Sequence, residues 1–170
     1  MMTIVESERL VLRRFIPDDA AFILELVNEP SWIRFIGDKK IRTLEDARNY
    51  LINGPMAMYE RVGFGLYMVE LKEGGVPAGM CGLIKRDTLE DVDIGFAFLP
   101  RFWGKGYAHE AAVATMAYGS NALKLKRIVA ITSPDNDSSI RLLEKIGLKY
   151  VETRKLTADG GESKVFAYPA

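Results

Sequence analysis

The sequence predicts one α/β domain built on a mixed, largely antiparallel sheet of six to seven strands flanked by helices. Two patterns carry this prediction. Residues 67–71 and 78–85 read as strands joined through Lys72-Glu73-Gly74-Gly75, a turn that connects antiparallel neighbours. Residues 91–99, 107–123 and 127–132 read as strand, helix and strand, the order of a parallel crossover. At 170 residues the chain is long enough for one core, so a single domain over 1–170 is expected.

The remaining elements follow from local patterns. Residues 10–15 alternate as a strand, and Pro17 then sits where a first helical turn tolerates proline. The helix that follows has its apolar residues at helical spacing, namely Phe22, Ile23, Leu26 and Val27. Thr43 reads as the cap of a second helix with the apolar stripe Ala47, Leu51 and Ile52. The C-terminal part is expected to hold a helix over 136–146 that stops at Gly147, and strands 149–154 and 164–168 around the turn 159–161.

Composition excludes several classes of function. Lys plus Arg equals Asp plus Glu at 23 each, so charge favours neither a nucleic acid nor an anionic membrane as partner. Cys81 is the only cysteine, which excludes an internal disulfide and fits a reducing compartment. With one histidine and one cysteine, no metal site is expected. Neither a signal peptide nor a membrane span is read near the start of the sequence, so we expect a cytoplasmic protein.

The most informative segment is the turn between the strand at 91–99 and the Ala-rich helix. Gly104 and Gly106 let the backbone approach a ligand closely, and the helix start leaves N–H groups without partners, which suits a phosphate. A P-loop is excluded because Gly106 is followed by Tyr107 rather than by Lys and Ser or Thr. The dinucleotide fingerprint is excluded because the third glycine and the early βαβ unit are missing.

What remains is a resemblance to a known family. Arg101-x-x-Gly104-x-Gly106 resembles the pyrophosphate loop of the GCN5-related N-acetyltransferases (GNAT). Asn136-Asp137-Ser138-Ser139, followed by Glu144-Lys145-Ile146-Gly147, resembles the second cofactor segment of that family. The opening Glu8-Arg9-Leu10-Val11-Leu12-Arg13 is similar to the RimJ/RimL-like branch. These motifs span nearly the whole chain in the expected order.

The resemblance implies a fold whose central parallel pair of strands is splayed to bind acetyl-CoA. It implies an acetyl-CoA-dependent N-acetyltransferase that moves the acetyl group by direct attack to a primary amine, either a protein N-terminus or a small molecule. It needs no metal. The residues that it assigns to the cofactor are Ala97, Phe98, Leu99, Arg101, Trp103, Gly104, Lys105, Gly106, Tyr107, Ala108, Asn136 and Lys145. The N–H of Phe98 or Leu99 would polarise the thioester carbonyl.

Alternatives stay open for several of these residues. Phe96 and Phe98 share a strand face, and periodicity alone favours the core for both. Arg101 is either a phosphate contact or an exposed turn residue. Asn136 is either a pantetheine contact or a helix N-cap.

The catalytic assignments come from the same resemblance. Many relatives carry a tyrosine that protonates the leaving thiolate where this chain has Leu143, so Ser139 inherits that role, with helix capping as its alternative. Asp93 is the expected general base, with a solvated strand-end aspartate as its alternative. Glu110, His109 and a water chain to a distant carboxylate are further possibilities for the base.

The acceptor is expected to bind within residues 28–63, where Arg34 could hold a carboxylate or a peptide end. A homodimer is expected only by analogy with relatives. Two other classes of function remain open: a CoA-binding sensor that has lost catalysis, and a nucleotide-binding module.

Overall fold

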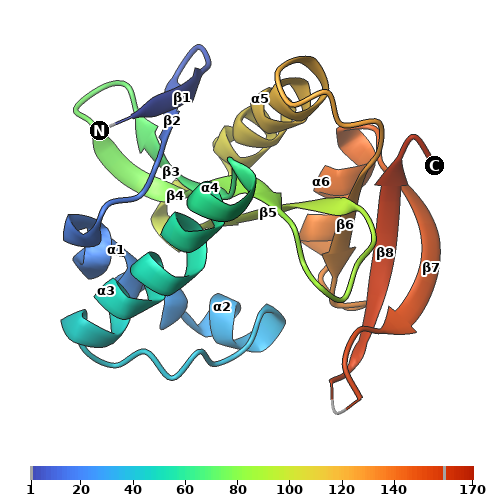
Figure 1. The fold of residues 1–170 in the computed structure, drawn as a ribbon, viewed down its shortest axis with the longest axis horizontal. Helices are drawn as coiled ribbons and strands as arrows, with labels where there is room; N and C mark the ends of the chain where they lie inside the picture. The colour runs from blue at the N-terminus through green and yellow to red at the C-terminus, as the bar shows by residue number, and fades with distance from the viewer. Residues whose placement is uncertain (1, 159) are drawn as a thin grey trace.

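A computed structural model describes residues 2–158 and 160–170 (Figure 1). Its centre is an eight-stranded sheet in the order β1-β2-β3-β4-β5-β6-β8-β7, antiparallel except for the β5–β6 pair. The strands are β1 Thr3–Glu6, β2 Leu10–Arg13, β3 Leu66–Leu71, β4 Val76–Ile84, β5 Val92–Phe98, β6 Ile128–Thr132, β7 Lys149–Lys155 and β8 Glu162–Tyr168. The predicted fold class and the parallel crossover are therefore confirmed.

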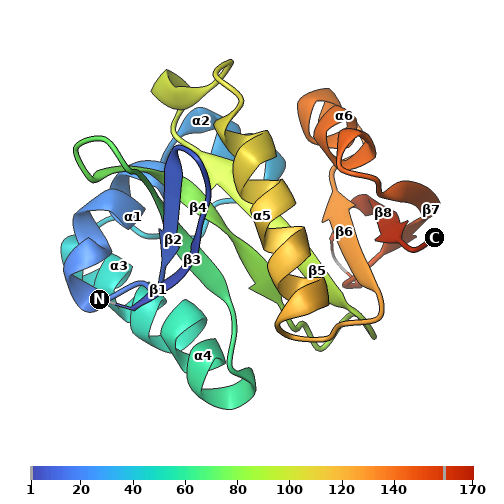
Figure 2. The ribbon, with the colours of Figure 1, turned by 90° about the horizontal axis from the view of Figure 1, so that it is seen from above.

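The helices cover the two faces of this sheet. They are α1 Ala20–Val27, α2 Pro30–Phe35, α3 Leu44–Leu51, α4 Ala57–Val62, α5 Tyr107–Asn121 and α6 Asp137–Lys145. Residues of α1 and α3 pack with Met68 and Met80, whereas Ala111 of α5 packs with Tyr67 and Cys81. Because neighbouring strand residues point to opposite faces, the two groups of helices lie on opposite sides of the sheet (Figure 2).

The sheet holds one strand more than the patterns predict. β1 has only four residues, and all of them are exposed or half-buried at the edge of the sheet, so the strand lacks the apolar alternation that reveals a strand. The apolar stripe predicted for the helix after Thr43 is wrong at one position: Ile52 is 42 % exposed. A π-helical turn, Ile52–Met56, begins there and shifts the helical phase that Ala47 and Leu51 follow into the core. Part of the predicted turn at 159–161 lies outside the described residues.

The site lies where the two parallel strands β5 and β6 move apart. Only Val92↔Ile128 and Asp93↔Val129 are paired, although β5 continues to Phe98 and β6 to Thr132. Beyond these pairs the two strands diverge, with α5 as the crossover between them (Figure 2). The splay leaves backbone groups on one edge of β5 without a neighbouring strand. Within the described part of the chain, no helix has the length and apolar character needed to cross a membrane.

Candidate active site

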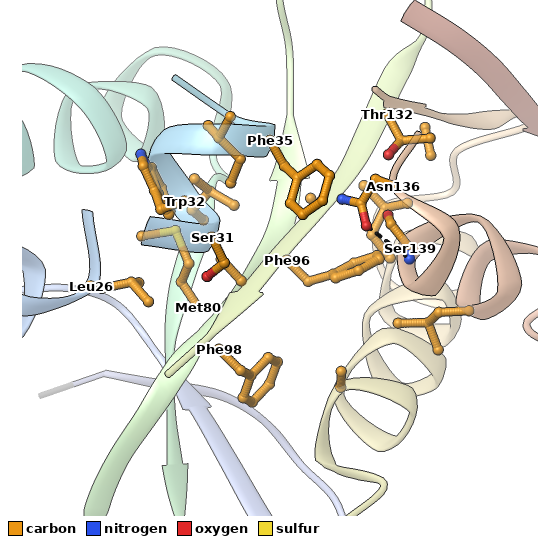
Figure 3. Close-up of a pocket in the computed structure, with 18 of the residues that line it drawn as sticks. Leu26, Ser31, Trp32, Phe35, Met80, Phe96, Phe98, Thr132, Asn136 and Ser139 are labelled. Atoms are coloured by element: carbon orange, nitrogen blue, oxygen red, sulfur yellow. Dashed lines mark hydrogen bonds between the residues drawn. The ribbon is translucent and has the colours of Figure 1, made fainter. Parts of the chain in front are cut away.

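A cavity of about 770 Å³ occupies the space that the diverging strands open. Its walls come from β5, β6, the turn before α5, and helices α2 and α6, and several of the lining side chains are seen in Figure 3. At one end lies the glycine turn with Gly104 and Gly106, and at the other lie Arg86 and Asp93. The cavity therefore joins the predicted phosphate loop to the predicted general base.

The edge of β5 presents backbone groups to this cavity. The N–H of Leu99 donates to the carbonyl of Ala78 over 3.0 Å, so it faces β4. Because hydrogen-bonding direction alternates along an antiparallel strand, the N–H groups of Phe98 and Phe96 point the other way, toward the gap before β6. The carbonyl of Phe98 accepts the indole N–H of Trp103 at 2.8 Å. Of the two predicted N–H donors, Leu99 is thus already engaged in the sheet, and Phe98 faces the cavity.

The glycine turn is shaped by two positive φ angles. Gly104 has φ +73° and Gly106 has φ +82°, in the region that L-residues rarely adopt. Gly106 is the N-cap of α5 and, among the described residues, no side chain caps this helix start. The first intrahelical bond that closes on the cap runs from Glu110 N–H to the carbonyl of Gly106, so the N–H groups of the first turn remain available to a ligand.

A side chain from the other end of the sequence braces this turn. The guanidinium of Arg9 donates from Nη1 to the carbonyl of Lys105 at 2.9 Å and from Nε to Glu110 at 2.7 Å, and it lies 4.5 Å from the ring centre of Tyr107. Glu110 also accepts from the hydroxyl of Ser7 and from the backbone N–H of Arg9. Glu110 is therefore committed to holding the β1–β2 connection against α5.

Helix α6 brings its predicted residues to the cavity. Asn136 is the N-cap, and its Oδ1 accepts the backbone N–H of Ser139 at 3.3 Å (Figure 3). This bond leaves the amide N–H₂ of Asn136 and the hydroxyl of Ser139 available to a ligand. Leu143, one turn further, is 1 % exposed and also lines the cavity. The capping interpretation of Asn136 is correct, and it does not exclude a ligand contact.

Asp93 is buried where the two strands are still paired. It is 1 % exposed, and its Oδ1 accepts from Nε of Arg86 at 3.0 Å. Burial raises the pKa of Asp93 to about 6, while the positive charge of Arg86 and its hydrogen bond hold that pKa down. Asp93 is thus not a solvated strand-end aspartate. It is ionised at neutral pH and still basic enough to accept a proton.

A hydrogen bond links α2 to the connection that leads into α6. The hydroxyl of Ser133, in the β6–α6 connection, donates to the carbonyl of Phe35 at the end of α2 over 3.0 Å. Arg34 is not part of the cavity lining. Its side chain is 67 % exposed and pairs with Asp135 over 3.5 Å. Phe35 itself points into the cavity with Phe96 (Figure 3).

Most of the predicted site residues come together around this space. Those that line the cavity are Asp93, Ala97, Phe98, Trp103, Gly104, Gly106, Tyr107, Ala108, Asn136 and Ser139. Four others are not among the lining residues. Leu99 is fully buried beneath the strand, and Arg101 pairs with Glu25 at 2.7 Å. Lys105 contributes its carbonyl to the Arg9 brace, and Lys145 is exposed in the last turn of α6.

Sequence reasoning missed Arg86, Lys39 and Phe96 as lining residues. Phe96 could have been predicted as a lining residue, because it lies on the same strand face as Phe98, which was expected at the cofactor. No local pattern points to Arg86 or Lys39, because both lie in irregular connections. No group of three or more His, Cys, Asp or Glu that could hold a metal ion is found in the described ranges 2–158 and 160–170.

Comparison with known proteins agrees with this geometry. Residues 9–149 match the sequence model of the Acetyltransferase (GNAT) domain. The chain is 30 % identical to an uncharacterized N-acetyltransferase, YoaA, of Bacillus subtilis strain 168, over 88 % of this chain and 84 % of YoaA. A GNAT acetyltransferase structure from Bacillus anthracis is 30 % identical, covers 98 % of this chain and 97 % of its own, and superposes with a TM-score of 0.79.

The fold is also shared with RimL, the ribosomal L7/L12 alpha-N-protein acetyltransferase, in a structure that contains coenzyme A. That similarity has a TM-score of 0.80 at 18 % identity and covers 97 % of this chain and 96 % of RimL. The family model and the relatives of 30 % identity define an acyl-transferring enzyme. The chain belongs to the GNAT acetyltransferase family.

Proposed function

We propose that this protein transfers the acetyl group of acetyl-CoA to a primary amine. One observation carries the proposal: the parallel strands β5 and β6 part after two paired positions, and the gap leads to a glycine turn with unpartnered N–H groups. A flat pantetheine arm fits such a gap between strands, and a diphosphate fits the helix start.

The residues present fit the cosubstrate. Gly104 and Gly106 carry no Cβ, so the first-turn N–H groups of α5 can approach the phosphate oxygens closely. On the pantetheine arm, the available amide N–H₂ of Asn136 can donate to a carbonyl. The indole of Trp103 covers the carbonyl of Phe98 and would give way to a pantetheine amide there.

The oxyanion that forms on the thioester carbon needs a fixed donor. The N–H groups of Phe98 and Phe96 meet this need because both face the cavity from a rigid strand. Strand rise puts Phe96 about 10 Å and Phe98 about 17 Å from Asp93 along β5. Phe96 is therefore the nearer of the two to the base.

Asp93 accepts the proton that the attacking amine loses. It is buried and paired with Arg86, so we infer that the proton travels through water rather than by direct contact. On the other side, the hydroxyl of Ser139 donates a hydrogen bond to the departing CoA thiolate and relays a proton to it, which the serine recovers from water. The C–S bond breaks as the tetrahedral intermediate collapses, leaving an amide and free CoA.

Two measurements test the proposal. Calorimetry should detect binding of CoA and acetyl-CoA, and a thiol reagent should detect CoA release only when an amine acceptor is added. CoA binding without release for any acceptor would instead support a sensor, and tighter binding of ATP or NAD would support a nucleotide module.

Ser139→Ala, with the neighbouring Ser138→Ala as control, tests the proton donor. We expect kcat to fall about tenfold for Ser139→Ala alone, because a thiolate leaves fairly well without help. Equal rates for the two variants would remove Ser139 from the mechanism. The identity of the acceptor within its class, a homodimer and a cytoplasmic location stay predictions.

A further inference from the structure

The charges at the acceptor end of the cavity are unbalanced. Among the described lining residues, the formal charges belong to Glu29, Lys39, Arg86 and Asp93. Glu29 is the N-cap of α2 and follows Glu25 of α1 by four residues, and Glu25 pairs with Arg101 just before the glycine turn, so Glu29 lies toward that turn. The acceptor end is left with two cations and one carboxylate that is already paired.

Arg86 is held so that its far end is unoccupied. Its Nε donates to Asp93, and its two terminal nitrogens make no hydrogen bond to any residue that the structure describes. The side chain is 39 % exposed and lines the cavity. A guanidinium fixed through Nε presents a planar pair of donors, the geometry that matches a carboxylate.

Lys39 adds a second cation from the α2–α3 connection. Within residues 2–158 and 160–170 it forms no ion pair. Lys39 lines the same cavity as Arg86. Partial desolvation and, after it, the positive charge of Arg86 lower the pKa of the Lys39 ammonium. Two like charges that line one cavity without an intervening anion favour an anionic ligand between them.

The rest of this end is apolar. Trp32, Phe35, Tyr50, Met58 and Ile84 line it, and Trp32 is only 6 % exposed. These walls suit an aliphatic or aromatic group. The buried indole Nε1 of Trp32 has no hydrogen-bond partner among the described residues. An acceptor that satisfies both features carries an acid group beside its amine and an apolar side chain.

We propose that the acceptor is a free α-amino acid with an apolar side chain, whose carboxylate binds between Arg86 and Lys39. The inference rests on the proposed acetyl transfer and narrows its substrate class. It excludes polyamines, which would bring positive charge to two cations. It also disfavours protein N-termini, in which a neutral peptide group stands where the carboxylate would be.

The test compares matched acceptors on matched variants. L-leucine and L-phenylalanine are each compared with their amides, and kcat/KM is measured by CoA release. The amide has a less basic amine, so more of it is unprotonated at neutral pH, which biases the comparison against the proposal. Lys39→Met removes one cation, and Lys40→Met is the control, because Lys40 is the next residue, is exposed as Lys39 is, and is not among the cavity-lining residues.

We expect the wild type and Lys40→Met to prefer the acid by about 10- to 100-fold, the value of one charged hydrogen bond. In Lys39→Met the ratio of kcat/KM for the acid to that for the amide should be about tenfold smaller, while kcat/KM for the amides stays unchanged. Equal use of acid and amide by the wild type, or an equal loss on both in Lys39→Met, would overturn the proposal.

A binding measurement separates this inference from the transfer reaction. Calorimetry on CoA-loaded protein compares N-acetyl-leucine with N-acetyl-leucinamide. Tighter binding of the acid to the wild type than to Lys39→Met supports the anion site even if no amine releases CoA, an outcome that would refute acetyl transfer alone. Equal binding of acid and amide refutes the anion site.

Discussion

The two ends of the cavity differ in the kind of group that they offer to a ligand: backbone N–H groups at one end and side chains at the other. At the glycine turn, the groups proposed to contact the ligand are backbone N–H groups whose direction is set by the φ angles of Gly104 and Gly106. At the acceptor end, the proposed contacts are side chains on separate segments: Lys39 before α3, Arg86 after β4, and Asp93 in β5. An end that binds through backbone N–H groups can keep the same ligand when side chains are substituted. An end that binds through side chains can change its ligand when those side chains are substituted.

This difference predicts where single substitutions act. A change at the acceptor end should alter kcat and its pH dependence while CoA still binds. A change at the glycine turn should weaken CoA binding and leave kcat at saturating acetyl-CoA little changed.

Asp93→Asn should have the largest effect. Loss of a general base lowers kcat by on the order of 1,000-fold, while the affinity for CoA measured by calorimetry stays near that of the wild type. For the wild type, kcat should rise with pH through about 6, because Asp93 must be ionised to accept a proton. Unchanged kcat in Asp93→Asn would assign the base to another group.

Arg86→Met sharpens this test. The positive charge of Arg86 and its hydrogen bond lower the pKa of Asp93, so removal should move the acid limb of the kcat profile to higher pH. Saturating acceptor keeps any loss of acceptor affinity out of this measurement. An acid limb that does not move would show that the limb does not report Asp93.

The raised pKa of Asp93 also affects stability, with a definite sign. Between the ordinary value of 3.8 and about 6, the folded state binds this proton more tightly than the unfolded state. The free energy of unfolding therefore falls with rising pH across that window, by about 3 kcal/mol from this group. Denaturant titrations at both ends of the window should show this fall in the wild type and not in Asp93→Asn.

Gly106→Ala should have the next largest effect, at the opposite end. A Cβ there is strained at φ +82° and lies 3.3 Å from Nη2 of Arg9, so the turn must shift and would carry the N–H donors away from the diphosphate. Loss of about two charge-assisted hydrogen bonds weakens CoA binding on the order of 100-fold.

Gly75→Ala is the matched control, because Gly75 has φ +61° in the β3–β4 hairpin and a Cβ there meets nothing within 4 Å. Both variants should lose similar stability, and only Gly106→Ala should lose CoA affinity. Equal CoA affinity in the two would break the distinction between the ends.

The same difference explains what sequence patterns could predict. The glycine turn was found because Gly104 and Gly106 are neighbours in the chain and their effect on the backbone is local. The fold class followed from hairpin and crossover patterns that are also local. The period-2 pattern favours the core for Phe98, and its side chain does lie in the core at 7 % exposure. Phe98 also lines the cavity, because β6 leaves β5 after Asp93. That separation is a tertiary event that no pattern within β5 encodes.

The acceptor end could be predicted only in outline for the same reason. Arg34 was the expected carboxylate contact because it lies in the right segment, but its side chain extends outward to Asp135. Lys39 and Arg86 come to line one cavity only after α2, α3 and the β4–β5 connection have packed. Their residue types are common on surfaces, so nothing in the sequence distinguishes them.

The smallest predicted effect tests whether the glycine turn depends on its backbone alone. Arg9 holds the turn from outside through the carbonyl of Lys105 and the ring of Tyr107, and it is not among the cavity-lining residues. Arg9→Met keeps the length of the side chain and removes these polar contacts. We expect CoA to bind about tenfold more weakly because the donors are less well positioned, with kcat at saturating acetyl-CoA little changed.

Arg61→Met, at an exposed arginine of α4, controls for the loss of a surface charge and should bind CoA like the wild type. If Arg9→Met also binds CoA like the wild type, the φ angles of the two glycines suffice to fix the turn. If it binds more weakly, the end that binds through backbone N–H groups also relies on one side chain, placed there by β1 and β2 pairing at the edge of the sheet. The contrast between the two ends would then be one of degree, because Arg9 supports the N–H donors without touching the ligand.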